Sequence, residues 1–513
     1  MPVDFLILAA DSAWGGDYHD SYKRVKEDVR AINHSMYEFH THLGMRVLGP
    51  SKIAWIARKH GYSSRVLSKL QMISVSDIIS LCEPFVDQKT IIGVSTSLLG
   101  YPHGNFTPQS FRNSNLQEDS AIYKLLFALD HFRNKYKNKV IVGGSQAIAF
   151  EHIFEADYVL HGEAENSLPR LLDSIKRSGI QRKPYDWNIT SCSFKWHESD
   201  HVVPKEPVPL ETSRGCIFRC RFCQFANIGK KIGTFERPLD NIKEEITDNY
   251  EKYQTTHYWL ADDTFNDNDE RVIQFCEMLE SLPFRVNLMG YIRLDLAHRY
   301  QKTTQRLLNA GLVGCSFGIE SFHPEASRAV GKAFSAKYAK EFLDHFYFDM
   351  AKENVMINCC NIVGLPGETA KDLEKTLDWY SKRRHIHMNW SSLILYDPKR
   401  SKKEQEKSIF ELEAAKYGYK FFDDKPLNYW ESPTMNHPQA VELRQHITRR
   451  TKKHNIEAGE PWLNMHYLSI LGITPKQARN KYKNWLNIYL QETKKIIAHN
   501  SQYFDNIKRK FIS

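Results

Sequence analysis

The sequence predicts an α/β protein made of two parallel-sheet domains and a small C-terminal region that is mostly helical. Two observations lead to this fold class: short β-branched runs alternate with helical patterns in the first half, and a second alternation follows a proline-rich, irregular stretch. The first alternation predicts a Rossmann-like (flavodoxin-like) domain, and the second a full or partial (β/α) TIM-type barrel. The expected parts are the first domain at 1–185, a linker at 186–208, the barrel at 209–397 and the helical region at 398–513.

Length and composition place the chain among ordinary globular proteins. Its 513 residues are about three times the length of a typical ~150-residue domain. Hydrophobic residues make up 42% and charged residues 26%, which excludes a disordered or fibrous chain. Nine cysteines in so long a chain do not form a disulfide framework, and no apolar run approaches the ~20 residues of a membrane span. These features predict a soluble cytoplasmic protein.

Several predicted strands of the first domain end in small or hydroxyl-bearing residues. The expected strands lie at 5–10, 64–67, 91–97, 139–145 and 158–163, and the expected helices at 52–60 and 168–175. In open parallel sheets, ligands bind beyond the carboxyl ends of the strands. The residues at such positions are Ser95, Thr96, Ser97, Gly143, Gly144 and Ser145. A polar segment at 11–44 is inserted after the first strand, and we interpret it as a solvated lid or helical pair, with a substrate contact as the alternative.

The second alternation is more regular. Helices are expected at 238–253, 269–279, 303–310 and 336–351, and strands at 258–261, 286–292, 314–318 and 356–363. In the first of these helices the apolar residues Leu239, Ile242, Ile246 and Tyr250 share one face, as a helix packed on a sheet requires. Repetition of this kind is typical of a (β/α) barrel.

The most specific feature of the chain is a loop with three closely spaced cysteines, Cys216, Cys220 and Cys223. Thiolates are soft ligands, and three on one short loop can hold three corners of a four-iron cluster. A structural zinc site needs a fourth ligand, but the next histidine and cysteine along the chain are His257 and Cys276. Three ligands leave one iron open, which a substrate-binding cluster requires. The alternative is a chance grouping of cysteines in a reduced loop.

This CxxxCxxC motif, with Phe222 before its last cysteine, resembles the radical S-adenosylmethionine (SAM) superfamily. The resemblance implies a [4Fe–4S] cluster that cleaves SAM reductively to methionine and a 5′-deoxyadenosyl radical. It continues through the later strand ends to about residue 395, including a Gly-Leu-Pro-Gly turn at 364–367. Each of these later motifs alone is also an ordinary turn or helix cap. The residues that the resemblance places against SAM are Asp262, Asp263, Arg293, Glu320 and Ser321.

The first domain resembles the cobalamin-binding domain that precedes the radical SAM barrel in one large subclass. The resemblance implies that the strand ends at 95–97 and 143–145 hold cobalamin, since glycine lets backbone approach a large flat ligand. The alternative is a flavodoxin-like domain that has lost its ligand. The chain has no Asp-x-His-x-x-Gly motif, by which some cobalamin proteins ligate cobalt. The absence of this motif is compatible with two alternatives: the domain binds cobalamin without a protein histidine beneath the cobalt, or it binds no cobalamin.

Other candidate residues favour structural roles. Cys359 and Cys360 are neighbours on a predicted strand, so only one can face the barrel interior, and packing is favoured over radical quenching. Glutamates near the basic segments at 399–403 and 444–453 favour a solvated helical face over a nucleic-acid surface. Core packing is favoured over the lining of a substrate pocket for four tryptophans, Trp379, Trp390, Trp430 and Trp462. Too few cysteines precede the loop to build the second cluster of a methylthiotransferase.

The two resemblances together imply a cobalamin-dependent radical SAM enzyme, most simply a methyltransferase acting on an unactivated carbon or phosphorus centre. Two alternatives stay open: a radical SAM rearrangement, cyclisation or ring contraction without methyl transfer, and a non-catalytic iron–sulfur binding protein. The expected partners are a small-molecule or peptide substrate and an electron donor such as flavodoxin or ferredoxin, without nucleic acid or membrane. The C-terminal region carries no motif that identifies the substrate.

Overall fold

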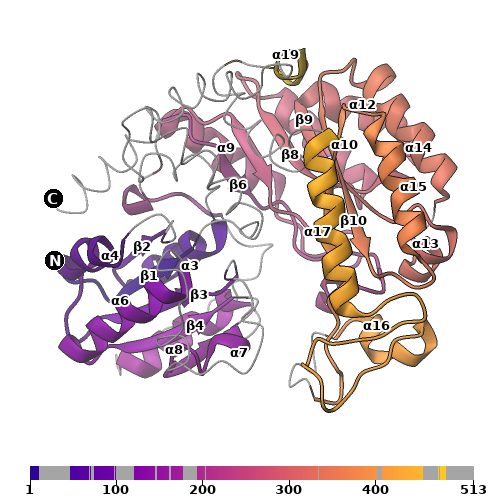
Figure 1. Ribbon diagram of the computed structural model, residues 1–513. Coiled ribbons are helices and arrows are strands. Elements are labelled where there is room, and N and C mark those ends of the chain that lie inside the picture. Colours follow the sequence, from indigo (N-terminus) through magenta and orange to yellow (C-terminus); the bar gives the residue numbers. More distant parts are fainter. Residues whose placement is uncertain are drawn as a thin grey trace, which may run out of the picture. The chain divides into compact units, whose positions relative to one another are not determined.

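The structure is a computed structural model (Figure 1). The residues that it describes are 1–10, 47–68, 70, 74–97, 99, 121–144, 147–160, 163–176, 193–200, 202, 204–332, 334–400, 407–454, 472 and 474–480. The chain divides into two compact units: one contains Met1–Pro209 and Asp240–Thr255, and the other contains Leu210–Leu239 and Thr256–Lys483. The predicted domain limits stay predictions, and the inserted segment at 11–44 lies outside the described residues.

Five parallel strands form the first sheet, in the order β2-β1-β3-β4-β5 (Figure 1). They are β1 (Phe5–Ala9), β2 (Ser64–Leu67), β3 (Ile91–Ser95), β4 (Lys139–Gly143) and β5 (Tyr158–Leu160). This is the strand order of flavodoxin-like folds, so the predicted Rossmann-like domain is confirmed. Every residue of β1 is buried, which fits a central strand covered on both faces.

Helices cover both faces of this sheet. They are α3 (Leu48–Lys59), α4 (Val75–Cys82), α6 (Ala121–Tyr136), α7 (Ala147–Phe150) and α8 (Ala164–Lys176), with short 3₁₀ turns η2 (Glu83–Phe85) and η4 (Glu198–Asp200). Alternate side chains of β1 enter two separate cores. Leu6 and Leu8 pack with residues of α4 and α6, whereas Phe5 and Ile7 pack with residues of α3 and α8. This two-sided burial explains why the strands are continuous apolar runs in the sequence.

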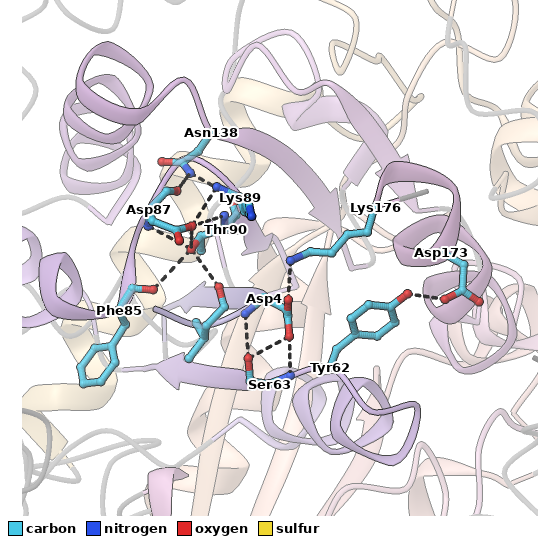
Figure 2. Close-up of polar contacts among 11 residues, drawn as sticks. Asp4, Tyr62, Ser63, Phe85, Asp87, Lys89, Thr90, Asn138, Asp173 and Lys176 are labelled. Carbon is cyan, nitrogen blue, oxygen red and sulfur yellow. Dashed lines mark hydrogen bonds and ion pairs between the residues drawn. The ribbon is translucent and has the colours of Figure 1, made fainter. Parts of the chain in front are cut away.

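Polar contacts tie together the amino-terminal ends of the strands (Figure 2). The Asp4 carboxylate, just before β1, accepts from the backbone N–H and the hydroxyl of Ser63 at 2.9 Å each and pairs with Lys176 Nζ at 2.5 Å. Just before β3 and β4, the Asn138 amide donates to the Thr90 carbonyl at 2.8 Å. This edge serves stability, while ligands of such sheets bind at the opposite, carboxyl edge.

Six parallel strands form the second sheet, in the order of the sequence (Figure 1). They are β6 (Val208–Leu210), β7 (His257–Leu260), β8 (Asn287–Ile292), β9 (Leu312–Glu320), β10 (Met356–Val363) and β11 (Ile386–Ser392). A closed barrel of this type has eight strands, so of the two predicted alternatives the described strands form the partial barrel. The strand predicted at 356–363 coincides with β10.

The connections between these strands are mostly helical. They are η5 (Phe225–Ile228), α9 (Leu239–Tyr253), α10 (Asp269–Glu280), α11 (Leu294–Arg299), α12 (Gln301–Ala310), α13 (Pro324–Val330), α14 (Ala336–His345), the π-helical turn η6 (Phe346–Met350) and α15 (Ala370–Ser381). Three of these helices, α11, α13 and α15, were not predicted, and neither was strand β11; α11 and α13 are too short for a clear helical period. Helix α13 begins at a proline and ends at Gly331, whose φ of 89° is left-handed.

The C-terminal region is described in part. Its helices are α16 (Ile409–Leu412), the 3₁₀ turn η8 (Ala414–Tyr417), α17 (His437–His454) and α19 (Pro475–Asn480). Helix α17 packs on the second sheet, where the Thr451 hydroxyl lies 3.8 Å from Met388 Sδ of β11. Trp390 and Trp430 are buried, which confirms core packing for both. Trp379 is only half-buried, with Arg383 over its ring, and Trp462 lies outside the described residues. Among the described helices, none has the length and apolarity needed to span a membrane.

Candidate functional site

The three predicted cysteine ligands lie on the long loop between β6 and α9. The Cys223 backbone N–H donates to the Cys220 carbonyl at 2.9 Å, which closes a tight turn between these two residues. The thiols of Cys216, Cys220 and Cys223 are free of disulfides and partly exposed. The structure therefore presents all three on one accessible loop, which we call the cysteine loop (residues 211–237).

Burial in the cysteine loop disfavours the ionised form of two of its thiols. Burial raises the pKa of the Cys216 thiol, and it raises the pKa of Cys223 to about 11. The charge of Cys220 adds to both shifts, so these thiols lie close enough to disfavour one another's ionisation. In the part of the chain that is described, no three His, Cys, Asp or Glu side chains converge on a site for a single metal ion. In an iron–sulfur cluster each thiolate binds a different iron, so the three thiols need not converge on one point. The three cysteines therefore fit such a cluster.

The loop after β7 braces the start of the cysteine loop. The Asp262 carboxylate accepts the backbone N–H of Thr212 at 2.7 Å and of Ser213 at 3.1 Å, and also the Thr212 hydroxyl. Asp263 accepts the Gly215 N–H at 2.9 Å. Burial raises the pKa of Asp262 to about 7 and that of Asp263 to about 6. Asp262 is fully buried and serves the loop itself, whereas Asp263 is partly exposed.

A buried ion pair, which the sequence analysis missed, fixes the later part of the cysteine loop. Lys230 Nζ lies 2.8 Å from the Asp267 carboxylate and donates to the Ser213 hydroxyl at 2.9 Å. The loop that carries Asp267 also holds Thr264, whose hydroxyl lies 3.3 Å from Cys216 Sγ. No spacing rule joins a lysine and an aspartate so far apart in the chain, so the sequence held no signal for this pair.

Arg293, which directly precedes α11, is brought to the cysteine loop. Its guanidinium carbon lies 3.6 Å from the centroid of the Phe218 ring, and its Nη1 lies 3.7 Å from Cys220 Sγ. Asp295 accepts from its Nε at 2.7 Å, and the Asn266 side chain bonds both its backbone N–H and its carbonyl. The guanidinium is therefore held in place beside the Cys220 sulfur.

Glu320 and Ser321 lie at the carboxyl end of β9. Glu320 has a left-handed backbone with φ of 65°, and its carboxylate lies 3.4 Å from Lys332 Nζ. A Cβ at Gly318 would come within 2.5 Å of the Glu320 Oε1, so a larger residue there would displace the Glu320 carboxyl group from this position. The Ser321 hydroxyl donates to the carboxylate of Glu368, in the turn after β10. The structure thus joins two strand ends that the sequence analysis treated separately.

Glu368 is a buried carboxyl group that the sequence analysis did not single out. It is fully buried, and its Oε2 has no hydrogen-bond partner among the described residues. Burial raises its pKa to about 8, partly offset by the Ser321 hydroxyl. It therefore holds a proton at neutral pH and acts as a neutral brace between β9 and β10.

At the carboxyl edge of the first sheet, the predicted residues divide into supporting and accessible ones. The Thr96 hydroxyl and backbone N–H both donate to the Gly143 carbonyl at 2.9 Å, and Thr96 is fully buried. Gly144 has φ of 106°, and a Cβ there would lie 2.6 Å from Ser97 Oγ, so it packs directly against the β3 loop. Ser95 and Ser97 are partly exposed at this edge, whereas Ser145 lies outside the described residues.

Fold and site together define a class of protein: a partial parallel barrel whose cluster-type cysteine loop follows its first strand, preceded by a flavodoxin-like domain. Residues 210–380 match the family model of the Radical SAM superfamily. This third of the chain is therefore a Radical SAM domain, and the predicted resemblance is confirmed for it. The matched stretch begins within β6 and ends within α15.

Three similar proteins extend this finding. A curated protein, bacteriochlorophyllide d C-8(2)-methyltransferase of Chlorobaculum tepidum, is 22% identical over 285 residues, which cover 50% of this chain and 60% of that protein. The structure of the radical SAM methyltransferase TsrM from Kitasatospora setae, with tryptophan substrate and a SAM analogue bound, has a TM-score of 0.54 and 14% identity, covering 83% of this chain and 80% of TsrM. The structure of the cobalamin-dependent SAM radical enzyme OxsB, with aqua-cobalamin bound, has a TM-score of 0.53 and 13% identity. The match covers 99% of this chain and 80% of OxsB. At these identities the two structures share the fold with this chain.

Proposed function

We propose that this protein is a cobalamin-dependent radical SAM methyltransferase that acts on an unactivated centre of its substrate. The observation that carries the proposal is a cysteine loop on a partial barrel in the same chain as a parallel sheet of order 2-1-3-4-5. TsrM and the C. tepidum protein are named as methyltransferases, and OxsB as a cobalamin-dependent enzyme. The proposal includes a small-molecule or peptide substrate, a flavodoxin- or ferredoxin-type electron donor and a cytoplasmic location.

In this proposal Cys216, Cys220 and Cys223 ligate a [4Fe–4S] cluster. Once reduced, such a cluster with SAM on its open iron supplies a 5′-deoxyadenosyl radical. The chain's own part is to hold the thiolates and exclude water. Arg293 beside Cys220 offsets the negative charge of the ligated thiolates, and Asp262 keeps the loop in shape through its three backbone and hydroxyl donors.

We propose that SAM lies against the strand ends that carry Asp263, Arg293, Glu320 and Ser321. Asp263 and Arg293 both contact the cysteine loop and carry opposite charges, which suits the ammonium and carboxylate of an amino acid. Asp262 supports the cysteine loop rather than SAM itself, because its described hydrogen bonds all come from that loop. Glu320 is the carboxyl group that we assign to the ribose hydroxyls, because it lies at the carboxyl end of β9, where Lys332 fixes it at 3.4 Å.

We propose further that cobalamin binds at the carboxyl edge of the first sheet, beside Ser95, Ser97 and Gly143, with Ser145 in the same loop. Cobalamin supplies a methyl carrier. Thr96 and Gly144 hold the β3 and β4 ends together beneath it. This edge suits a ligand because it flanks the change in strand order of the sheet.

The first test asks whether methyl transfer occurs. Protein reconstituted anaerobically with iron and sulfide is incubated with reductant and SAM, with and without hydroxocobalamin. The proposal expects S-adenosylhomocysteine only when the corrinoid is present, and 5′-deoxyadenosine in both samples. A rearrangement enzyme would release 5′-deoxyadenosine without S-adenosylhomocysteine, and a non-catalytic iron–sulfur protein would release neither.

The second test asks where the corrinoid binds. The protein is incubated with hydroxocobalamin and desalted, and its visible spectrum is recorded. We expect Ser97→Trp to abolish retention of the corrinoid, because it adds bulk at the partly exposed carboxyl edge. Ser80→Trp is the matched control, since Ser80 is exposed on α4 away from that edge. Equal retention by both variants would contradict the assigned edge.

A further inference from the structure

The two faces of β10 have different neighbours, and this separates its adjacent cysteines. Cys359 lies on the face covered by α15: the Asn361 amide donates to the Cys359 carbonyl at 3.1 Å, and Tyr380 of α15 donates to Asn361 Oδ1 at 3.3 Å. Because side chains alternate along a strand, Asn358 and Cys360 lie on the opposite face. The packing role predicted for these cysteines therefore holds for Cys359, which is fully buried, whereas Cys360 is partly exposed.

A row of four polar residues crosses this opposite face. The strand register pairs Tyr291 of β8 with Ser316 of β9, Ser316 with Asn358 of β10, and Asn358 with His387 of β11. Within the row the Asn358 amide donates to the Ser316 hydroxyl at 2.9 Å. The inward rows of such barrels are ordinarily filled by branched apolar residues. We call these four residues the polar row.

The polar row lies above an apolar one. One step toward the amino ends of the strands, the register aligns Trp259, Met289, Gly314 and Met356. A Cβ at Gly314 would meet the Met289 side chain at 2.8 Å, so the glycine makes room for this methionine. One step toward the carboxyl ends lies Cys360, whose Sγ is 3.3 Å from the Ser316 hydroxyl. The sheet face that carries the polar row is thus apolar toward the amino ends of the strands and polar toward their carboxyl ends.

Asn358 contributes to the polar row a buried acceptor atom without a hydrogen-bond donor in the described part of the chain. Asn358 is 1% exposed, and its Oδ1 accepts no hydrogen bond from any described residue. A buried carbonyl oxygen without a donor costs roughly 1–3 kcal/mol, so such atoms are rare unless a ligand or water completes them. The Asn358 amide nitrogen donates to the Ser316 hydroxyl at 2.9 Å and to Cys360 Sγ at 3.6 Å, so the open group of this side chain is its acceptor, Oδ1.

The polar row is electrically neutral and extends toward the proposed SAM site. Burial lowers the pKa of His387 to about 4, so its imidazole is neutral. Burial raises the pKa of Tyr291 well above its ordinary value, and the nearby Cys360 and Asp263 raise it further. Tyr291 is therefore uncharged and lies near Asp263, which braces the cysteine loop.

From this arrangement we infer that the polar row recognises the substrate through a neutral group bearing an N–H or O–H donor, such as an amide, which hydrogen-bonds to Asn358 Oδ1. A carboxylate or phosphate has only acceptor oxygens, which would repel Asn358 Oδ1, so neither group is favoured here. The inference rests on the proposed function, for which it names the class of substrate group. No chemical step is assigned to the polar row, because its role is to position the substrate.

The test uses three small probes of similar shape and the full-length protein. Propionamide carries N–H donors, N,N-dimethylpropionamide carries none, and propionate carries a negative charge. Their dissociation constants are measured by saturation-transfer NMR. We expect propionamide to bind about fivefold more tightly than either of the others, the ratio that a net hydrogen bond of ~1 kcal/mol supports. Equal binding of the three probes to the wild-type protein would overturn the inference.

Variants locate the preference. Asn358→Leu removes the acceptor with little change in volume and should abolish the preference for propionamide, and Asn358→Val, which suits a strand, is the second variant if the first folds poorly. Asn361→Leu is the matched control: it makes the same change on the same strand, on the α15 face, and should keep the preference. Persistence of the preference in both Asn358 variants would also overturn the inference. Probe binding requires no SAM cleavage, so absence of S-adenosylhomocysteine in the first test would refute methyl transfer without touching this result.

Discussion

Lys230 and Asp267 form a 2.8 Å ion pair whose side chains are only 0% and 4% exposed, and this pair joins the cysteine loop to the loop after β7. The same ammonium donates to the Ser213 hydroxyl, and Ser213 in turn donates to Asp262. A continuous set of polar contacts therefore holds both ends of the loop that carries the three cysteines. A buried pair of this kind is costly to break, since one partner alone leaves an uncompensated charge.

We expect Lys230→Met to destabilise the protein by about 3–5 kcal/mol and to lower its iron content after reconstitution. Urea unfolding and iron per chain measure the two effects. Lys231→Met, at the exposed neighbouring position, should change neither. The double variant Lys230→Met/Asp267→Leu should recover part of the stability, because it removes both charges. Equal stability of the Lys230 and Lys231 variants would refute the structural role of the pair.

Single replacement of Cys216, Cys220 or Cys223 by alanine should abolish the iron-dependent visible absorbance and all production of 5′-deoxyadenosine, because each would remove one cluster ligand. Anaerobic reconstitution followed by iron analysis and chromatography of the nucleoside products checks this. Cys276→Ala serves as the control, since Cys276 is buried on α10 and should leave the iron content unchanged. Full iron retention in all three loop variants would rule out the assigned ligands.

Glu368 should make stability depend on pH. Burial raises its pKa to about 8 in the folded protein, whereas an unfolded glutamate titrates near 4.3. Between these values only the folded state holds the proton, so its contribution to stability is complete below about pH 4 and is lost as the pH rises toward about 8, by up to ~1.4 kcal/mol per pH unit. Glu368→Gln removes this loss and should be more stable than wild type at pH 8. Urea unfolding across pH 5–9 measures the difference, with the exposed Glu325→Gln as control. A difference that does not vary with pH would contradict the raised pKa.

The two glycines at the end of β4 should respond differently to alanine. Gly144 has φ of 106° and would place its Cβ 2.9 Å from the Ser97 backbone nitrogen, so Gly144→Ala should cost about 1–3 kcal/mol. A Cβ at Gly143 would meet only Leu160 at 3.7 Å, an ordinary contact, so Gly143→Ala should change stability by less than about 1 kcal/mol. Thermal or urea unfolding of the two variants side by side measures this, and equal losses would contradict the predicted role of Gly144.

Much of the fold could be predicted because most strands are buried on both faces, which makes them largely apolar runs; β1 is the clearest case. The cysteine loop was visible because its ligands lie close together in sequence. The extent of the barrel could not be predicted from the sequence, since it depends on which strands pair. The polar row and the Lys230–Asp267 pair were equally hidden: Ser316 and Asn358 are 42 positions apart, and only the register of β9 on β10 brings them together. Contacts set by register have no local signature.

The polar contacts at the amino edge of the first sheet also have a consequence for how this protein can diversify. Asp4, Ser63, Thr90 and Asn138 stabilise the domain from the side opposite the proposed ligand edge (Figure 2). Substitutions in the loops after β3 and β4 therefore leave this anchorage in place. A lineage could exchange one bound cofactor or substrate for another without first losing a foldable domain. Directed evolution of a new binding specificity should accordingly accept changes at Ser95 and Ser97 more readily than at Asp4 or Thr90.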